Sequence, residues 1–207
     1  MSDIKEIEIN ETVVFIKDVE FLNQKYSLLN ITSLEQVRFD SFKCNKRRAT
    51  FLGVRSIVKE FWPSSTIAYN NVGAPTLSDQ PDLYISISHS QYLCAIAKNS
   101  KNPIGLDIEI HSGQASRLRS RFTHTDEEAF LSGELEDTLL WSAKESLYKI
   151  AGVKKLIFKE QLRITGHDRM QQRLNGFVRF HDNRVQKYHI DYRIMGDIIL
   201  TLATPEN

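Results

Sequence analysis

The stretch from Ile104 to Ile110, IGLDIEI, constrains this chain most, because apolar residues alternate in it with Gly105, Asp107 and Glu109. A period of two predicts a β-strand whose apolar side chains enter a core while both carboxylates point to the other face. Carboxylates at positions i and i+2 of a strand lie about 7 Å apart. At an effective dielectric near 20 they repel by about 2–2.5 kcal/mol. A fold can tolerate a repulsion of this size where the two carboxylates are exposed to water.

The stretch from Leu139 to Ile150, LLWSAKESLYKI, has the spacing of an amphipathic helix, and Gly152 follows where a helix would end. Trp141, Glu145 and Lys149 fall at i, i+4 and i+8 and share one face. A second face can be buried and carries Leu140, Ala143, Leu147 and Ile150. A solvated helix with one Glu–Lys pair has the same pattern. If Glu145 instead lies beside the acidic strand, three carboxylates form a donor set that suits Mg²⁺.

Periodicity also predicts the elements around these two stretches. Helical spacing predicts a helix from Asn45 to Trp62, ending before Pro63. Ser33 and Gln36 resemble a capping box that would begin an earlier helix, and Thr125 and Glu128 would cap a short one. A hairpin turn is expected at His89-Ser90-Gln91. Strands are expected over residues 4–16, 83–87, 92–97, 156–164, 176–180, 188–194 and 197–203, with turns at 70–75, 166, 182–183 and 195–197.

Composition excludes several classes of protein. The chain has 207 residues with 27 Lys and Arg against 26 Asp and Glu, so no global field favours nucleic acid or a membrane surface. It has no apolar run of about 18 residues that would span a bilayer, and MSDIKEIEIN does not resemble a signal peptide. Cys44 and Cys94 lie in unrelated contexts and are expected to be reduced thiols. These features predict a cytoplasmic protein.

The acidic strand and the helix, written GLDIE and WSAKESLYK, resemble the two-part signature of the 4′-phosphopantetheinyl transferases. SISHS (Ser86–Ser90) and RRATFLGVR (Arg47–Arg55) resemble the larger, Sfp-type class of that family. The four matches follow the family's order. The resemblance implies an α+β fold of two similar halves, residues 1–103 and 104–207, related by a pseudo-twofold axis. Each half would be an antiparallel sheet packed on a long helix, with the active site in the cleft between them.

The activity implied by the resemblance is that of a holo-[carrier-protein] synthase. It moves 4′-phosphopantetheine from coenzyme A, the co-substrate, to a serine of an apo acyl or peptidyl carrier protein. The reaction needs Mg²⁺ and releases adenosine 3′,5′-bisphosphate. The motif match places Asp107, Glu109 and Glu145 on the metal and makes Asp107, Glu145 and Lys149 the catalytic residues. Glu145 or a metal-bound water would take the serine proton, and the residues do not separate these two roles.

The resemblance also implies a binding site for coenzyme A in the first half and at the catalytic helix. The implied residues are Arg47, Arg48, Thr50, Ser88, His89, Lys144 and Lys149. Arg38 is a further candidate. Glu127 matches an acidic position that supports the site, although a carboxylate near a helix N-terminus is favoured by the helix dipole alone. The carrier would dock on residues 112–122, where Arg117, Arg119 and Arg121 alternate with Leu118 and Phe122. A solvated basic loop packed by Leu118 and Phe122 is the equal alternative.

One departure from the family's pattern keeps an alternative function open. The family's Gly-Lys-Pro is Gly73-Ala74-Pro75 here, so one expected phosphate-binding lysine is absent. A catalytically weak member that binds coenzyme A or a carrier as an accessory protein is therefore the alternative function. An unrelated Mg²⁺-dependent nucleotide enzyme is disfavoured, since neither GxxxxGK[ST] nor GxGxxG is present. A site formed between two halves of one chain predicts a monomer.

Overall fold

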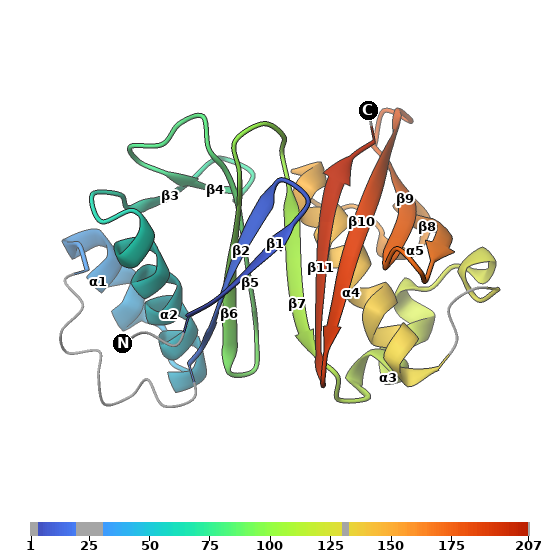
Figure 1. Ribbon diagram of the computed structural model, residues 1–207, viewed down its shortest axis with the longest axis horizontal. Coiled ribbons are helices and arrows are strands. Elements are labelled where there is room, and N and C mark those ends of the chain that lie inside the picture. The colour runs from blue at the N-terminus through green and yellow to red at the C-terminus, as the bar shows by residue number, and fades with distance from the viewer. Residues whose placement is uncertain (1–3, 20–30, 130–132, 207) are drawn as a thin grey trace.

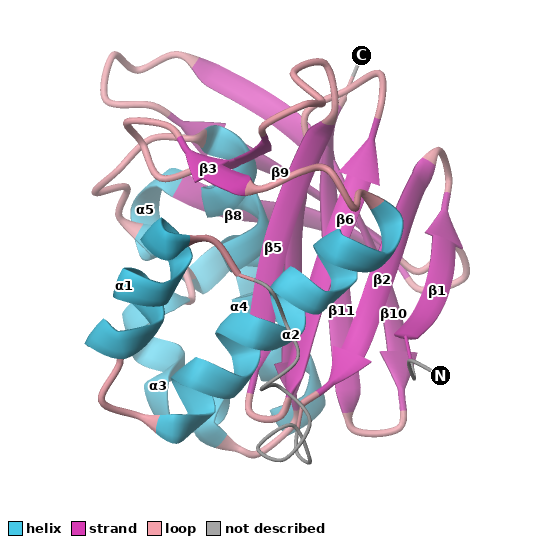
Figure 2. Ribbon diagram, turned by 90° about the vertical axis from the view of Figure 1, so that its left-hand side faces the viewer, coloured by secondary structure: helices cyan, strands magenta, loops and turns pink. Residues whose placement is uncertain are grey.

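Two antiparallel sheets stand side by side in the computed structural model, which describes residues 4–19, 31–129 and 133–206. The described chain is a mixed α/β structure (Figure 1). In Figure 2, helix α2 (Asn45–Phe61) crosses the outer face of the first sheet. Helix α4 (Glu134–Ala151) lies against the second sheet, where it packs on β7 and β11.

The first half contains a four-stranded sheet of order β1-β2-β6-β5 and a small two-stranded sheet, β3-β4. Its elements are β1 (Ile4–Ile9), β2 (Thr12–Asp18), α1 (Ser33–Ser41), α2, β3 (Ile67–Tyr69), β4 (Pro75–Leu77), β5 (Tyr84–Ser90) and β6 (Leu93–Asn99). The second half contains a five-stranded sheet of order β7-β11-β10-β9-β8. Its elements are β7 (Gly105–Ile110), α3 (Gln114–Phe122), the short 3₁₀ helix η3 (Thr125–Glu127), α4, α5 (Phe158–Gln161), β8 (Leu162–Asp168), β9 (Arg173–Arg179), β10 (Val185–Met195) and β11 (Ile198–Pro205).

A row of serine side chains joins the edges of the two sheets. The hydroxyl oxygens of Ser86, Ser88 and Ser90 on β5 accept hydrogen bonds from the backbone N–H groups of Leu106, Ile108 and Ile110 on β7. The contacts repeat every second residue because both strands alternate faces. On the edge of β7 that does not pair with β11, the serines of SISHS therefore supply acceptors for backbone N–H groups that would otherwise lack a partner in the sheet.

Helix α4 approaches β7 closely at Gly105. A Cβ atom there would lie 2.0 Å from the carbonyl oxygen of Ser146 and 2.9 Å from the backbone nitrogen of Ile150. Only glycine permits that approach. It brings the face of α4 that carries Trp141, Glu145 and Lys149 against the acidic strand.

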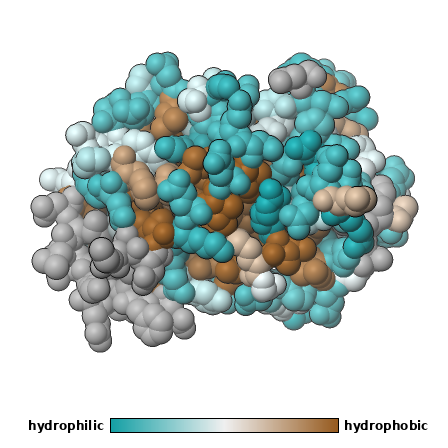
Figure 3. Space-filling model, viewed as in Figure 1, coloured by the Kyte–Doolittle hydropathy of each residue, from teal (hydrophilic) through white to brown (hydrophobic). Residues whose placement is uncertain are grey.

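The two halves share a hydrophobic core. Buried residues of β2 and β6, among them Val14 and Ala95, pack with Leu106 and Ile108 of β7 and Leu200 of β11 in one cluster. Each half also has its own cluster, one under α2 and one under α4. On the face shown in Figure 3, hydrophobic residues gather near the middle of the view among hydrophilic ones. The halves are therefore packed together by burial of apolar surface as well as by the serine row.

The structure confirms the main predicted elements and corrects several boundaries. The helices around residues 45–61 and 139–150 are present, and Gly152 ends α4 with φ +59°. The capping box of α1 begins one residue earlier than predicted, because Thr32 caps Glu35. His89 and Ser90 are strand residues, and Gln91, with φ +44°, makes the turn.

Other predicted elements are wrong in detail. Residues 158–161 are helical, so the strand predicted from 156 begins only at Leu162. Gly166 lies at an irregularity within β8 and does not form a turn. The cap predicted at Thr125 is instead His124 with Glu127 as its partner, and residues 130–132 of that predicted helix lie outside the described residues. None of the described helices is both long and apolar enough to cross a membrane. Both cysteines are free thiols, with Cys94 buried and Cys44 exposed.

Candidate functional site

Asp107 lies buried between the two halves and is 4% exposed. Its Oδ1 accepts hydrogen bonds from Ser88 Oγ and Lys149 Nζ, and its Oδ2 accepts one from Ser142 Oγ, each at 2.8 Å. Lys149 Nζ also donates to the carbonyl oxygen of Leu106. The fold thus does not leave this charge to water, because it supplies one cation and two hydroxyl donors.

Glu109 lies on the same face of β7 and is held by two side-chain donors. Ser90 Oγ donates to its Oε2 at 2.8 Å, and the Trp141 indole Nε1 donates to its Oε1 at 2.9 Å. Trp141 itself packs between Phe122 and Phe158. Burial and the neighbouring charge of Asp107 raise the pKa of Glu109 above its ordinary value. The expected sharing of one face by the two carboxylates is confirmed.

Glu145 points toward the same cluster from α4 and makes no side-chain hydrogen bond to the described residues. Burial, followed by the charge of Asp107, raises its pKa from 4.5 to about 7; Glu109 adds to the shift and Lys149 opposes it. The three carboxylates predicted from sequence therefore lie close enough to repel one another. When all are ionised, Lys149 is the only cation bound directly to them within the described residues.

The donor chemistry of this cluster fits a hard divalent cation. Three carboxylates with a single lysine leave an excess of negative charge, and Glu145 has unused oxygen acceptors. As the side chains stand, however, no group of three His, Cys, Asp or Glu residues in the described chain is arranged to hold a metal ion. The oxygens of Asp107 and Glu109 accept hydrogen bonds from serine, tryptophan and lysine donors instead.

The raised pKa of Glu145 predicts a pH-dependent stability of the metal-free protein. The folded state binds the proton more tightly than the unfolded state, so stability should fall as pH rises from about 4.5 to about 7. Above pH 7 the ionised group should cost about 1–3 kcal/mol. Glu145→Gln should remove this cost, so the variant should melt higher than the wild type at pH 8 in chelator and match it near pH 5. Exposed Glu8→Gln is the matched control, and equal pH profiles for Glu145→Gln and wild type would contradict the assignment.

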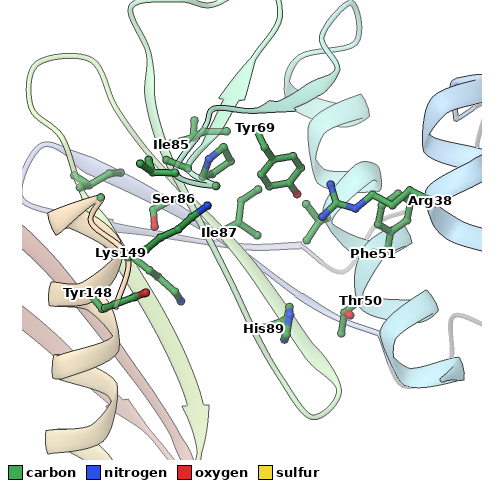
Figure 4. Close-up of a pocket in the computed structure, with 18 of the residues that line it drawn as sticks. Arg38, Thr50, Phe51, Tyr69, Ile85, Ser86, Ile87, His89, Tyr148 and Lys149 are labelled. Atoms are coloured by element: carbon green, nitrogen blue, oxygen red, sulfur yellow. The ribbon is translucent and has the colours of Figure 1, made fainter. Parts of the chain in front are cut away.

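A cavity of about 510 Å³ opens beside this cluster, between α2, β5 and the C-terminal end of α4. In Figure 4, Thr50 and Phe51 approach it from α2, while Tyr148 and Lys149 approach from α4. Ile85, Ile87 and His89 of β5 lie between them. Lys149 is shared, because it lines the cavity and also bonds to Asp107.

The described lining of the cavity is strongly cationic and contains no Asp or Glu. Its cations are Arg38, Arg47, Arg55, Lys149 and Lys154. Arg55 is neutralised by Glu35 at 3.2 Å, and Lys149 by Asp107. Arg38 instead lies over the ring of Tyr69, 4.5 Å from its centroid. Such a cavity favours an anionic ligand with an apolar part.

His89 faces the cavity as an acceptor for arginine. Arg47 Nη1 lies 2.6 Å from His89 Nε2, and because arginine can only donate, that nitrogen accepts. Burial, then the charges of Arg47 and Lys149, lower the pKa of His89. The histidine is therefore neutral near pH 7, and an anion at this place would favour its protonation.

The predicted ligand-binding residues divide into two groups. Arg47, Thr50, His89 and Lys149 line the cavity. Arg48 and Ser88 do not, because Arg48 lies over Phe39 and the Ser88 hydroxyl faces Asp107. Arg55, Tyr69 and Lys154 line the cavity but were not predicted as ligand-binding residues. Arg55 lies in the matched RRATFLGVR stretch, whereas no local pattern marks Tyr69 or Lys154.

The prediction that Lys144 contacts coenzyme A is wrong for this structure. Its side chain is fully buried, and Nζ lies 2.7 Å from Glu127 Oε2 and 2.5 Å from the carbonyl oxygen of Phe122. It also bonds to the carbonyl of Phe158 at 3.1 Å. Lys144 directly precedes Glu145, and one step along a helix turns the side chain about 100° around the axis, away from the cavity. Glu127 holds this lysine in a buried ion pair.

Comparison with models of protein families matches residues 103–203 to the 4′-phosphopantetheinyl transferase superfamily. Residues 103–203 form a domain of this superfamily. The matched range contains β7 and α4, and with them all three carboxylates and Lys149. No curated protein matches the chain. The family match supports a transferase that moves phosphopantetheine, and it leaves the cationic wall formed by α1 and α2 outside the matched range.

Proposed function

We propose that this protein transfers 4′-phosphopantetheine from coenzyme A to a serine of an apo acyl or peptidyl carrier protein, in a reaction that needs Mg²⁺. The observation that carries the proposal is the shared position of Lys149, which joins a cationic cavity to a cluster of three carboxylates. A phosphate-rich ligand in the cavity would present its pyrophosphate at this junction. The halves 1–103 and 104–207, each a sheet on a long helix, are proposed to be related by a pseudo-twofold axis, as in the larger Sfp-type class.

In the proposed reaction, the carrier serine oxygen forms a bond to the β-phosphorus of coenzyme A. The bond from that phosphorus to the bridging oxygen breaks, and adenosine 3′,5′-bisphosphate leaves. Glu145 lies at this junction and would take the serine proton as that bond forms. Lys149 stabilises the leaving phosphate once it turns from Asp107. Mg²⁺ held by Asp107, Glu109 and Glu145 would neutralise charge on the pyrophosphate.

The cavity residues position the nucleotide end of coenzyme A in this proposal. Arg38 and Arg47 supply charge that no described carboxylate neutralises, and Tyr69 and Phe51 supply flat apolar surface. Because both walls of the cavity come from one chain, the protein is proposed to act as a monomer. It is also proposed to be cytoplasmic and to bind neither nucleic acid nor membranes.

The test is to incubate the protein with coenzyme A, Mg²⁺ and a panel of apo acyl, peptidyl and polyketide carrier proteins. The expected result is that at least one carrier gains the mass of one phosphopantetheinyl group, and that chelator prevents this. A carrier whose acceptor serine is replaced by alanine is the control. No mass gain in any carrier, with coenzyme A binding intact, would contradict the transferase.

An accessory protein that binds coenzyme A or a carrier without turnover is the second candidate. The observation that favours it is Ala74, which lines the cavity where the family's Gly-Lys-Pro would supply a phosphate-binding lysine. The same assay separates the two, because an accessory protein would bind coenzyme A and leave the carrier mass unchanged.

The carrier is proposed to dock on α3. Arg117 and Arg121 are exposed one turn apart, whereas Arg119 pairs with Asp137 and Phe122 is core. Burial of Phe122 agrees with the alternative in which this residue packs the segment and does not contact the carrier.

We expect the double variant Arg117→Glu/Arg121→Glu to raise the KM for an acidic carrier about tenfold at low salt and to leave the KM for coenzyme A unchanged. The control Arg179→Glu/Lys187→Glu makes the same charge change on exposed residues of β9 and β10. Equal effects of both pairs would place the docking surface elsewhere.

A further inference from the structure

Lys154 connects the two halves at the rim of the cavity. It follows the end of α4, where Gly152 reverses the chain with φ +59°, and it lines the cavity. Its Nζ donates to the carbonyl oxygen of Asn71 at 3.0 Å, and the two residues are 83 positions apart in sequence. Asn71 belongs to the turn that joins β3 to β4. The lysine thus reaches from the second half to the first.

The turn that receives Lys154 holds its own shape. Asn70 Oδ1 accepts hydrogen bonds from the backbone N–H groups of Val72 and Ala74, at 3.1 and 2.9 Å. The backbone of Asn70 also bonds to Gly73 and Ala74. Since these bonds do not involve Lys154, the turn does not depend on the lysine. The exposed contact between Lys154 and Asn71 is therefore expected to contribute little to stability.

Lys154 carries a charge that its protein partner does not neutralise. Asn71 offers a neutral carbonyl, and within the described residues Lys154 forms no ion pair. The carbonyl oxygen of Lys154 is 3.2 Å from His181 Nε2, so the backbone is held while the ammonium contacts a weak acceptor. A phosphate is a stronger acceptor for an ammonium than a carbonyl is. An anionic ligand at this rim would draw the lysine from Asn71.

We infer that Lys154 binds a phosphate of the ligand at this turn and supplies the positive charge that Ala74 lacks. Ala74 and Lys154 line the same cavity, and the lysine already contacts the turn that contains Ala74. The inference rests on the proposed function, because that function places a polyphosphorylated ligand in the cavity. In this arrangement both halves form the phosphate subsite: the first half supplies the turn that contains Ala74, and the second half supplies the cation, Lys154.

The experiment measures binding of coenzyme A and of adenosine 3′,5′-bisphosphate to the full chain by titration calorimetry, without turnover. Lys154→Met should weaken binding of one or both ligands about five- to tenfold at low salt, and this loss of affinity should be smaller at high salt. Lys155→Met is the matched control, because that neighbouring lysine is exposed and does not line the cavity.

A rescue variant tests whether the two positions share one subsite. Ala74→Lys should restore ligand binding in the Lys154→Met protein. In the wild type the same substitution should increase affinity much less, so the effects of the two substitutions should be non-additive. The control Thr76→Lys adds the same charge further along the hairpin, and it should not rescue.

The possible failures are distinguishable. If wild type and Lys154→Met bind both ligands equally well, Lys154 is not a phosphate ligand and the proposed function stands. If the loss is independent of salt and Ala74→Lys does not restore binding, Lys154 is only a structural tie and the inference is overturned. If the wild type binds neither ligand, the proposed function falls and the inference falls with it.

Discussion

Asp107→Asn is expected to reduce phosphopantetheine transfer at least about a hundredfold, because it removes the negative charge that joins the carboxylate cluster to Lys149. The carboxylate also accepts from Ser88 and Ser142, and an amide cannot accept from all three donors with the same geometry. The measurement is the initial rate of mass gain by the carrier at saturating coenzyme A and Mg²⁺. Asp197→Asn, in the exposed turn between β10 and β11, is the control.

The same substitution should also lower stability. Repulsion between Asp107 and Glu109 alone would predict that removing one charge stabilises the metal-free protein. The structure reverses this sign, because Asp107 is 4% exposed and forms an ion pair with Lys149. We expect a loss of about 1–3 kcal/mol in the free energy of unfolding, measured with urea in chelator. The double variant Asp107→Asn/Lys149→Met should lose less free energy of unfolding than the two single variants lose together. That result would assign the loss in Asp107→Asn to the ion pair with Lys149. Near wild-type transfer by Asp107→Asn would contradict the site.

Glu127→Ala is expected to have the largest effect on folding, because it leaves the ammonium of Lys144 buried without its charge partner. Both side chains are completely buried. Breaking such a pair from one side costs about 3–5 kcal/mol, which in a chain of this size lowers the melting temperature by about 10 °C. Exposed Glu128→Ala is the neighbouring control. A fall in melting temperature no larger than that of this control would show that the pair contributes little.

The pH dependence of the stability of Glu127→Ala tests whether the unpaired charge of Lys144 causes the loss. Burial lowers the pKa of Lys144 from 10.5 to about 8 even though Glu127 raises it. Without Glu127 the folded-state pKa should fall further, so the unfolded state binds the proton more tightly and stability rises with pH. The difference in free energy of unfolding between wild type and Glu127→Ala should therefore be smaller at pH 9 than at pH 7. Adding Lys144→Met to Glu127→Ala should recover part of the loss at pH 7, and a double variant less stable than Glu127→Ala would contradict the explanation.

The sequence by itself determined which residues share a face. Period-two alternation placed Asp107 and Glu109 together, and spacing of four placed Trp141, Glu145 and Lys149 on one side of α4. These relations follow from the repeat of a strand or helix, which is local. For the same reason, the end of α4 at Gly152 was predictable.

Only the tertiary structure decided which partner each charged side chain reaches. Lys144 and Lys149 lie on one helix, yet the first bonds inward to Glu127 and the second to Asp107. Lys154 crosses to Asn71 in the other half. Lysine and arginine side chains are long, and packing of elements far apart in sequence sets which acceptor lies within their reach. A local sequence pattern predicts the face of the helix or strand on which such a side chain lies, but it does not predict which acceptor the side chain reaches.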